Sequence, residues 1–216
     1  MSLLPFYRLE TDRFVIRCYE PADAEVMSAT ILRNHEHLIK WMPWAVKDQH
    51  TMPFCLNLIR TFRGNYDLGT DYPMAIFNRA DGTYVGGTGL HNRAGKGALE
   101  IGYWIDENRC GQGFATHAAA ALTKAAFDYR EIHRMNIHMQ LGNVASQRVP
   151  ERLGYKMEGL LRQHYPLADN QFADILYFTM LREEYDASDL KQMNLRAFGF
   201  DGAELSIPEP SKAVPA

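Results

Sequence analysis

The sequence predicts a single α/β domain with a central mixed sheet flanked by helices. Short segments of alternating or apolar character recur along the chain and are typical of strands, as at residues 14–19 and 99–105. Segments with apolar residues at helical spacing separate them, most clearly in the alanine-rich run that begins at Phe114. The 216 residues show no internal repeat and no domain-splitting linker, and 46% of them are hydrophobic, which is enough for a full core.

The N-terminal part of the chain is predicted to form one strand and three helical segments. Residues 14–19 alternate as a strand does. Pro21 then starts a helix, because proline is favoured in the first helical turn. Two further helical segments are expected at residues 35–40 and 48–63.

The middle of the chain is predicted to form a hairpin-rich sheet. Gly86-Gly87 inside the second of its strands indicates a bulge or a bend, since glycine interrupts regular pairing. The glycine-rich residues 94–97 are typical of a hairpin turn. The strands of this region are expected at residues 72–77, 83–91 and 99–105.

The last third of the chain is predicted to complete the domain, which spans residues 1–186, and to end in an extension at residues 187–216. In the extension, Leu190, Met193, Ala197 and Phe198 suggest one docked helical face, followed after residue 202 by a loose, proline-rich tail. The late strands are expected at residues 135–139, 155–158, 160–165 and 172–181, with a turn at 168–170.

Residues 98–116 carry the clearest functional signal. An apolar strand ends, Gly111-Gln112-Gly113 follows after a short turn, and a helix opens at Phe114. The successive backbone N–H groups of residues 111–116, with the positive helix end behind them, would form a nest for an anion such as a pyrophosphate. Glycines in such a turn are more often plain turn chemistry. Thr116 replaces the third glycine of a dinucleotide-binding motif, and no Gly-Lys-Ser/Thr follows, which excludes both common nucleotide motifs.

A second segment, residues 143–155, makes the signal specific. The Gly111–Thr116 loop, the Asn143-x-x-Ser146 helix start and the Leu153-Gly154-Tyr155 exit together resemble the GNAT acetyltransferases. The nearest branch is the RimJ/RimL type, which acetylates the N-termini of ribosomal proteins. The resemblance covers about residues 8–185 and implies a mostly antiparallel GNAT-like sheet with acetyl-CoA as co-substrate and no metal. Supporting segments are Leu-Glu-Thr-Asp-Arg at 9–13, Trp-Met-Pro-Trp at 41–44 and Glu-Gly-x-Leu-Arg at 158–162.

The resemblance also implies roles for single residues. Ser146 would act as the general acid that protonates the departing thiolate, although serine is favoured in a first helical turn in any case. Asn143 would bind the pantetheine arm and cap its helix. Arg148 could reach a CoA phosphate, but it is interpreted as a solvated helix-surface residue. The predicted contacts to acetyl-CoA are Ile105, Gly111, Gln112, Gly113, Phe114, Ala115, Thr116 and Asn143.

The general base has several candidates. Glu100 lies on the strand expected beside the thioester, and its alternative role is a structural hydrogen bond. His164 and Tyr165 stand where the RimL-type pattern can carry a glutamate base, and this carboxylate is missing here. His164 could take the proton instead, because imidazole titrates near neutrality. Proton transfer to bulk water without a protein base stays open.

The acceptor side is predicted from aromatic residues. The resemblance to the GNAT family implies that the stretch with Trp41 and Trp44 helps to form the acceptor cleft and that Tyr165 faces this cleft. The alternative is that these aromatic residues pack under a helix. The leading function is therefore an N-acetyltransferase acting on a protein N-terminal amine, ribosomal or other. The alternatives are a small amine as acceptor (a polyamine, an aminoglycoside or an amino acid) and a non-catalytic acyl-CoA-binding regulatory module.

Composition and cysteine usage limit the partners. A formal net charge of −3 and a pI near 6.2 give no sign of direct nucleic-acid binding. Three scattered cysteines are typical of reduced thiols in a cytoplasm, and no segment reads as a membrane span. The C-terminal tail could also reach over a partner subunit in a homodimer.

Two further readings concern cysteine and histidine. Cys110 occupies the first position of the anion motif, so we expect it near phosphate rather than near the thioester, and direct transfer rather than covalent catalysis. The histidines suggest no metal site: His133 and His138 bracket a strand without acidic partners in sequence.

Overall fold

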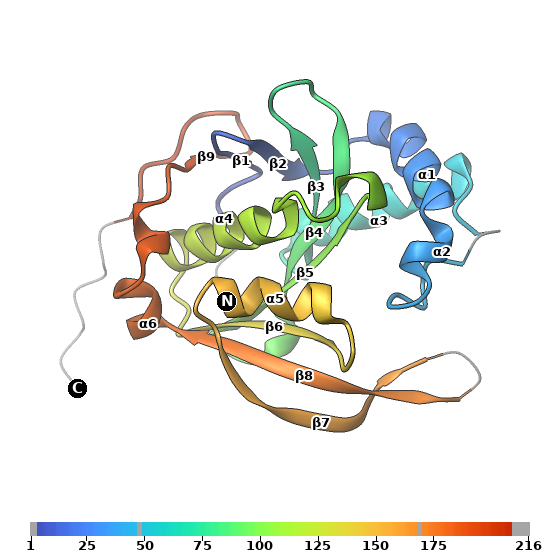
Figure 1. Ribbon diagram of the computed structural model, residues 1–216. Coiled ribbons are helices and arrows are strands. Elements are labelled where there is room, and N and C mark those ends of the chain that lie inside the picture. Colours follow the sequence, from blue (N-terminus) through green and yellow to red (C-terminus); the bar gives the residue numbers. More distant parts are fainter. Residues whose placement is uncertain (1–3, 47–48, 168–169, 209–216) are drawn as a thin grey trace.

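The computed structural model describes residues 4–46, 49–167 and 170–208 (Figure 1). Its strands are β1 (Arg8–Glu10), β2 (Phe14–Cys18), β3 (Tyr72–Asn78), β4 (Tyr84–His91), β5 (Ala98–Ile105), β6 (Arg134–Gln140), β7 (Lys156–Pro166), β8 (Phe172–Leu181) and β9 (Arg196–Phe198). Its helices are α1 (Ala24–Arg33), α2 (His35–Leu38), α3 (Met52–Leu68), α4 (Phe114–Tyr129), α5 (Val144–Arg152) and α6 (Arg182–Asp186). Short 3-10 turns are η1 (Pro21–Asp23), η2 (Asn92–Ala94), η3 (Glu107–Arg109) and η4 (Asp189–Gln192).

The strands form one sheet in the order β7-β8-β6-β5-β4-β3-β2-β1-β9. Among the described strands, all neighbours are antiparallel except β5 and β6, which are parallel. Helices cover both faces (Figure 1). On one face α4, with its buried alanines, packs against β5 together with α5; on the other, α1 and α3 enclose a second core that reaches Tyr84 and Trp104. The predicted α/β class with a mixed, mostly antiparallel sheet is confirmed.

The parallel pair β5–β6 separates after three residues. Ala98–Glu100 pair with residues 134–136. Beyond this point β5 follows β4 and β6 follows β8. The sheet therefore opens into a V, and the β5 backbone groups of residues 101–105 that face the gap have no strand partner in the described chain. Such groups need hydrogen-bond partners, which water or a ligand can supply.

The bulge predicted at Gly86-Gly87 is confirmed. Ile76 pairs with Gly86 but Phe77 pairs with Tyr84, so that Val85, next to Gly86, is the extra residue of β4. A Cβ atom at Gly86 would lie 2.1 Å from the carbonyl oxygen of Trp104, and one at Gly87 would lie 2.5 Å from the Trp104 indole nitrogen. The absence of side chains at both positions therefore lets β4 approach β5 and leaves room for the Trp104 ring.

Helix α3 differs in its ends from the predicted segment 48–63. It begins at Met52, because the Thr51 hydroxyl accepts a hydrogen bond from the backbone N–H of Phe54 and caps the helix. It ends before Gly69, whose φ of 70° is left-handed, as helix C-termini favour. The predicted start at residue 48 lies outside the described residues.

Strand β7 is continuous where the sequence suggested two pieces, at 155–158 and 160–165. Its register with β8 shifts twice, between Met157 and Gly159 and between Leu161 and Tyr165. In the second bulge, Gln163 has a φ of 49° and its backbone N–H donates to Asp174 Oδ1 at 2.8 Å. These bulges break the period-two alternation on which a strand prediction depends. The turn expected at 168–170 lies mostly outside the described residues.

The C-terminal extension does not form the docked helix that was predicted. It makes the short turn η4 and then β9, which pairs with β1 and buries Ala197 and Phe198. It is tied to α4 by Lys124, whose buried ammonium group contacts Asp128 at 2.7 Å and the Lys191 carbonyl oxygen at 2.9 Å. The extension thus belongs to the same sheet, and the tail beyond residue 208 lies outside the described residues. Within the described chain, none of the helices combines the length and apolar character that a membrane crossing requires.

Two glycine-to-alanine substitutions test the close approach of β4 and β5. We expect Gly86→Ala to destabilise the protein by about 2 kcal/mol or more, because the new methyl group would overlap the Trp104 carbonyl. Gly64, exposed in α3 with nothing within 4 Å of an added Cβ, is the matched control. Gly64→Ala should stabilise the protein by about 0.5–1 kcal/mol, since alanine is the better helix former. Urea unfolding measures both; an unchanged midpoint for Gly86→Ala would show that β4 moves aside at no cost.

Candidate active site

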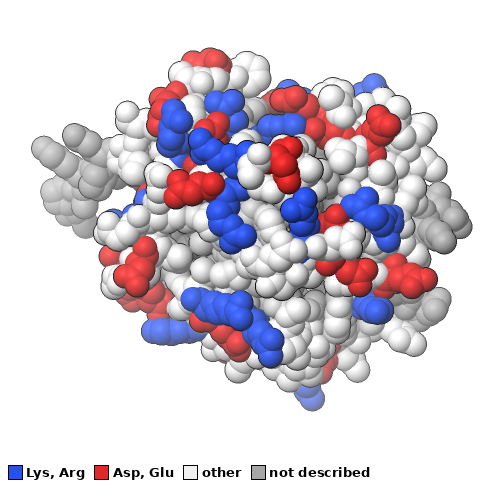
Figure 2. Space-filling model, turned by 45° about the horizontal axis from the view of Figure 1, so that its top comes forward, with Lys and Arg blue, Asp and Glu red and all other residues white. Residues whose placement is uncertain are grey.

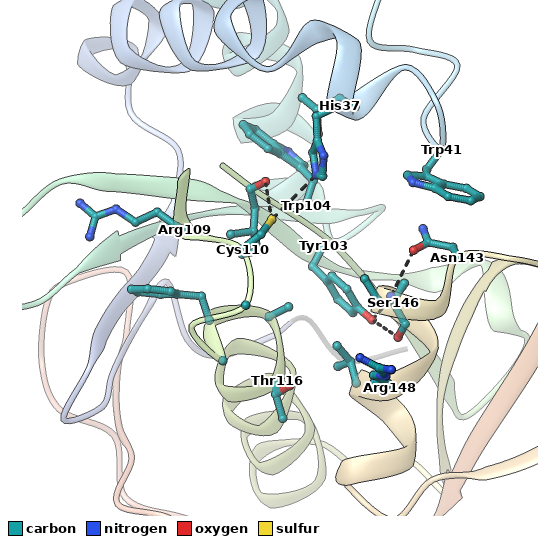
Figure 3. Close-up of a pocket in the computed structure, with 18 of the residues that line it drawn as sticks. His37, Trp41, Tyr103, Trp104, Arg109, Cys110, Thr116, Asn143, Ser146 and Arg148 are labelled. Atoms are coloured by element: carbon teal, nitrogen blue, oxygen red, sulfur yellow. Dashed lines mark hydrogen bonds between the residues drawn. The ribbon is translucent and has the colours of Figure 1, made fainter. Parts of the chain in front are cut away.

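Two cavities meet where β5 and β6 separate. The α4–α5 cavity, of about 410 Å³, lies between the N-termini of these helices and the end of β5 (Figure 3). The aromatic cavity, of about 540 Å³, is lined by side chains from residues 41–44 and 49–62 and by the sheet face that carries Glu100 and Trp104. Both volumes are within the range typical of small-molecule sites. The residues shared by both cavities are Trp41, Met42, Tyr103, Trp104, Asn143 and Ser146.

The loop before α4 has the form of an anion-binding nest. None of the backbone N–H groups of residues 111–116 donates a hydrogen bond to another described residue. Gly111 and Gly113 have φ values of 75° and 78°, and this left-handed backbone suits glycine. Arg13 holds the loop from the side, because its Nη2 donates to the Gln112 carbonyl oxygen at 3.0 Å. The free donors and the α4 N-terminus fit the diphosphate of coenzyme A.

Basic side chains extend this positive region. Arg109, Arg148 and Arg152 all line the α4–α5 cavity. Arg148 is exposed, as expected for a helix surface, but the structure places it at the cavity, on α5, the helix that also carries Ser146 (Figure 3). On the face in Figure 2, basic and acidic groups are interspersed rather than gathered by sign. Positive charge therefore forms no broad patch on the face that Figure 2 shows.

Ser146 and Asn143 are positioned by the start of α5. Asn143 Oδ1 accepts a hydrogen bond of 3.1 Å from the Ser146 backbone N–H and caps the helix. The Ser146 hydroxyl lies 3.1 Å from the phenol oxygen of Tyr103, and both point into the space between α4 and α5 (Figure 3). Burial raises the pKa of Tyr103 while Ser146 opposes this shift, so that Tyr103 stays a neutral phenol. The site therefore holds two neighbouring hydroxyl groups on the gap side of β5.

Glu100 is the last residue of β5 that pairs with β6, and it is only 5% exposed. Its Oε1 accepts a hydrogen bond of 2.8 Å from Arg93 Nε, and its Oε2 lies 3.1 Å from His138 Nδ1. Burial opposes ionisation, but the hydrogen bonds and charges of His138 and Arg93 outweigh it and lower the pKa of Glu100 to about 2. A carboxylate with both oxygens occupied and so low a pKa is a poor proton acceptor near neutrality. The geometry favours its structural role.

His164 lines neither cavity. It is exposed on β7, in the bulge beside Gln163, whereas the next residue, Tyr165, lines the aromatic cavity. Strand alternation does not hold within this bulge, but His164 is exposed and absent from the lining of both cavities. We therefore do not retain His164 as the general base. Tyr165 lines the aromatic cavity, and its predicted contact with the acceptor stays a prediction.

The aromatic stretch 41–44 borders the cavities rather than filling a core. Trp41 lines both cavities, and its carbonyl oxygen accepts a hydrogen bond of 2.9 Å from Gln140 Nε2 across the gap. Trp44 is 41% exposed, and its ring lies edge-on to Trp104 at a centroid distance of 6.2 Å. Both indoles are thus available to a ligand in the aromatic cavity.

Cys110 lies on the α4–α5 side of the site. Its sulfur is 3.8 Å from His37 Nε2, and among the two cavities it lines only the one with the nest (Figure 3). Burial, with Glu107 and Asp106 nearby, raises the pKa of its thiol, which disfavours a thiolate nucleophile. In the described part of the chain, no group of three His, Cys, Asp or Glu side chains is arranged to hold a metal.

Sequence reasoning missed the polar residues around Glu100. His138 does have an acidic partner, in contrast to the reading of the sequence, because Glu100 reaches it from the neighbouring strand. His91 lies on the same sheet face and contacts Asp71 Oδ1 at 2.7 Å. A signal was present in β6, where Asn136, His138 and Gln140 alternate with apolar residues, but it does not reveal which strand lies alongside.

Comparisons with known proteins agree with this geometry. A family model described as an acetyltransferase (GNAT) domain matches residues 13–156. YdaF of Bacillus subtilis strain 168, named as a candidate ribosomal N-acetyltransferase, is 32% identical over 178 residues, which are 81% of this chain and 94% of the relative. The [ribosomal protein uS5]-alanine N-acetyltransferase of Escherichia coli K12 is 28% identical over 180 residues, 80% of this chain and 90% of the relative.

A solved structure extends the agreement to the cofactor. RimJ of Mycobacterium smegmatis, solved in complex with CoA-disulfide, is 27% identical with a TM-score of 0.74, and the match covers 82% of this chain and 86% of RimJ. The family model alone spans more than half of the chain. The protein therefore belongs to the GNAT family of N-acetyltransferases, with acetyl-CoA as its co-substrate.

Proposed function

We propose that the enzyme acetylates the N-terminal amine of a protein or peptide in the cytoplasm. The observation that carries the proposal is the aromatic cavity, which opens beside Ser146 on the face of the sheet opposite α4. Trp41, Trp44 and Tyr165 line it, and aromatic walls can bury the apolar groups of a flexible N-terminus. The uS5-alanine relative supports the same acceptor class. The free cysteines of the described chain suit a reducing compartment.

The charges in this cavity argue against a polycation as acceptor. Among its described lining residues, the carboxylates are Asp71 and Glu100. Asp71 contacts His91 at 2.7 Å, and Glu100 is held by Arg93 and His138. A polyamine or an aminoglycoside carries several ammonium groups, and in this cavity these groups would find no carboxylate that is free to pair with them. A peptide N-terminus brings a single amine and apolar neighbours.

Acetyl-CoA supplies an activated acetyl group, and this chain binds it and handles the protons. We assign the diphosphate to the amides of residues 111–116, with Arg148 close by. The β5 edge beyond Glu100 offers unpaired backbone groups to the amides of the pantetheine arm, with Asn143 opposite. Ser146, hydrogen-bonded to Tyr103, would donate a proton to the departing thiolate. The phenol of Tyr103 can in turn replace that proton.

The nest is tested by a charge substitution with a matched shape. We expect Gly113→Asp to weaken acetyl-CoA binding at least about tenfold more than Gly113→Asn, because both introduce the same bulk but only aspartate repels the phosphates. Asparagine also tolerates the left-handed backbone at this position. Calorimetric titration at two salt concentrations measures the difference, which should shrink at high salt. Equal acetyl-CoA affinities of the two variants would show that the diphosphate does not bind at this loop.

Ser146→Ala tests the proton donor. Alanine keeps the backbone N–H that Asn143 caps, so the helix start stays intact. We expect kcat to fall about 100-fold with nearly unchanged acetyl-CoA affinity, since general-acid catalysis is typically worth this much. Tyr103→Phe, which removes the phenol beside Ser146, should lower kcat less. A kcat of Ser146→Ala within about threefold of wild type would reduce Ser146 to a positional role.

The acceptor class is tested by competition between substrates. CoA-thiol release should be at least about tenfold higher in kcat/KM for peptides with a free N-terminus than for polyamines, aminoglycosides or amino acids, because only peptides fill the aromatic cavity. Trp44→Ala should raise the peptide KM without weakening acetyl-CoA binding. Phe200→Ala, an exposed aromatic residue that lines neither cavity, is the control and should leave KM unchanged. Faster turnover of any small amine would contradict the peptide assignment.

A further inference from the structure

A histidine beside the gap in the sheet has the geometry of a proton acceptor. His138 lies on β6, two residues beyond the last pair with β5, and it lines the aromatic cavity together with Asn143 and Ser146. Its ring is stacked on Tyr177, with centroids 6.3 Å apart and planes at 12°, and Tyr165 flanks it at 6.4 Å. Tyr165 is on β7 and Tyr177 on β8, and packing against their rings holds the plane of the His138 ring in the cavity wall.

The neighbouring carboxylate sets the tautomer of this ring. Glu100 is ionised near neutrality and can only accept hydrogen bonds. The contact of 3.1 Å between Glu100 Oε2 and His138 Nδ1 therefore requires the proton to be on Nδ1. In the neutral ring, Nε2 then carries the free lone pair, and among the described residues it has no hydrogen-bond partner. Arg93 holds the other oxygen of Glu100 and keeps the carboxylate in place.

Other groups near the gap lack this combination. His91 has a comparable partner in Asp71, but its Nε2 lies 2.9 Å from the position of a Cβ at Gly102 and is thus packed on the sheet. Burial raises the pKa of both Tyr165 and Tyr177, so these phenols stay protonated. Among these groups, all in the described part of the chain, His138 alone combines a ring nitrogen bound to a carboxylate with a second ring nitrogen that is free in the cavity wall.

We propose that His138 is the general base of the reaction and that Glu100 is its positioning residue. One proton leaves the acceptor ammonium through His138 Nε2 to solvent, and the freed nitrogen forms the amide bond as the carbon–sulfur bond breaks. A second proton leaves the nitrogen as the amide forms and balances the proton given to the thiolate, so that each turnover releases one proton. Glu100 stabilises the imidazolium by its charge. This inference rests on acetyl transfer to an amine, whichever amine is the acceptor.

The pH dependence of kcat/KM tests the base. Wild type should lose activity as the pH falls, because a protonated ring cannot accept a proton. We expect His138→Gln to lower kcat about 100-fold, to abolish this acidic limb and to leave acetyl-CoA affinity unchanged. His133→Gln, at an exposed histidine just before the same strand, is the matched control and should keep both rate and profile.

Two measurements separate catalysis from a structural role. Free imidazole should restore part of the activity of His138→Ala, in proportion to its unprotonated fraction, which a packing role does not predict. Nitrogen NMR of the wild-type imidazole should show the Nδ1–H tautomer, and Glu100→Gln should disturb it, because an amide can donate to Nδ1.

Several outcomes would overturn the inference. These are an acidic limb that survives in His138→Gln, a limb lost instead in His91→Gln or His164→Gln, absent imidazole rescue, and an Nε2–H tautomer. If a small amine proves to be the better acceptor, the proposed peptide specificity fails. The same profile measured with that amine still decides the role of His138.

Discussion

The early separation of β5 and β6 is the constraint on which the site depends. Parallel pairing ends at Glu100, and each strand then follows its antiparallel neighbour. The gap joins two cavities that lie on opposite faces of one sheet. In the proposed binding modes, acetyl-CoA and the amine approach the same point from different sides without competing for space. The unpaired β5 edge, costly if left dry, becomes a binding surface for a ligand with amide groups.

Charge placement follows from the same geometry. Glu100 sits where the strands separate, buried and ionised, and it is stable there only because Arg93 and His138 occupy its two oxygens. The Glu100 carboxylate therefore orients Arg93 and His138 rather than accepting protons itself. The positive α4 N-terminus is kept on the other face, beside the α4–α5 cavity. Under the proposed assignment, the phosphates and the reacting amine therefore bind in separate electrostatic environments.

The sequence was sufficient to predict what depends on local chemistry. The nest at residues 111–116, the Asn143 cap and the bulge at Gly86 each follow from residue types at fixed spacing. The start of α3 depends on the single Thr51 cap, and the bulges of β7 depend on the backbone register with β8. A hydrophobic pattern, which is read over many residues, predicts neither. The Leu190–Phe198 segment had helical spacing, but pairing with β1 decided that its end is a strand. His138 was missed because its partner belongs to another strand, which no local pattern reveals.

The strand β6 connects the proposed base to the acceptor wall. His138 and Gln140 point to the same face, and Gln140 donates to the Trp41 carbonyl oxygen at 2.9 Å. The loop that carries Trp41 and Trp44 is thereby held to the strand that carries His138. On the opposite side of the gap, Gly87 leaves the space in which the Trp104 indole packs, edge-on to Trp44. The loop with Trp41 and Trp44 therefore contacts both strands that border the gap, β5 and β6. An amine positioned by these two indoles would also be positioned relative to the proposed base, His138.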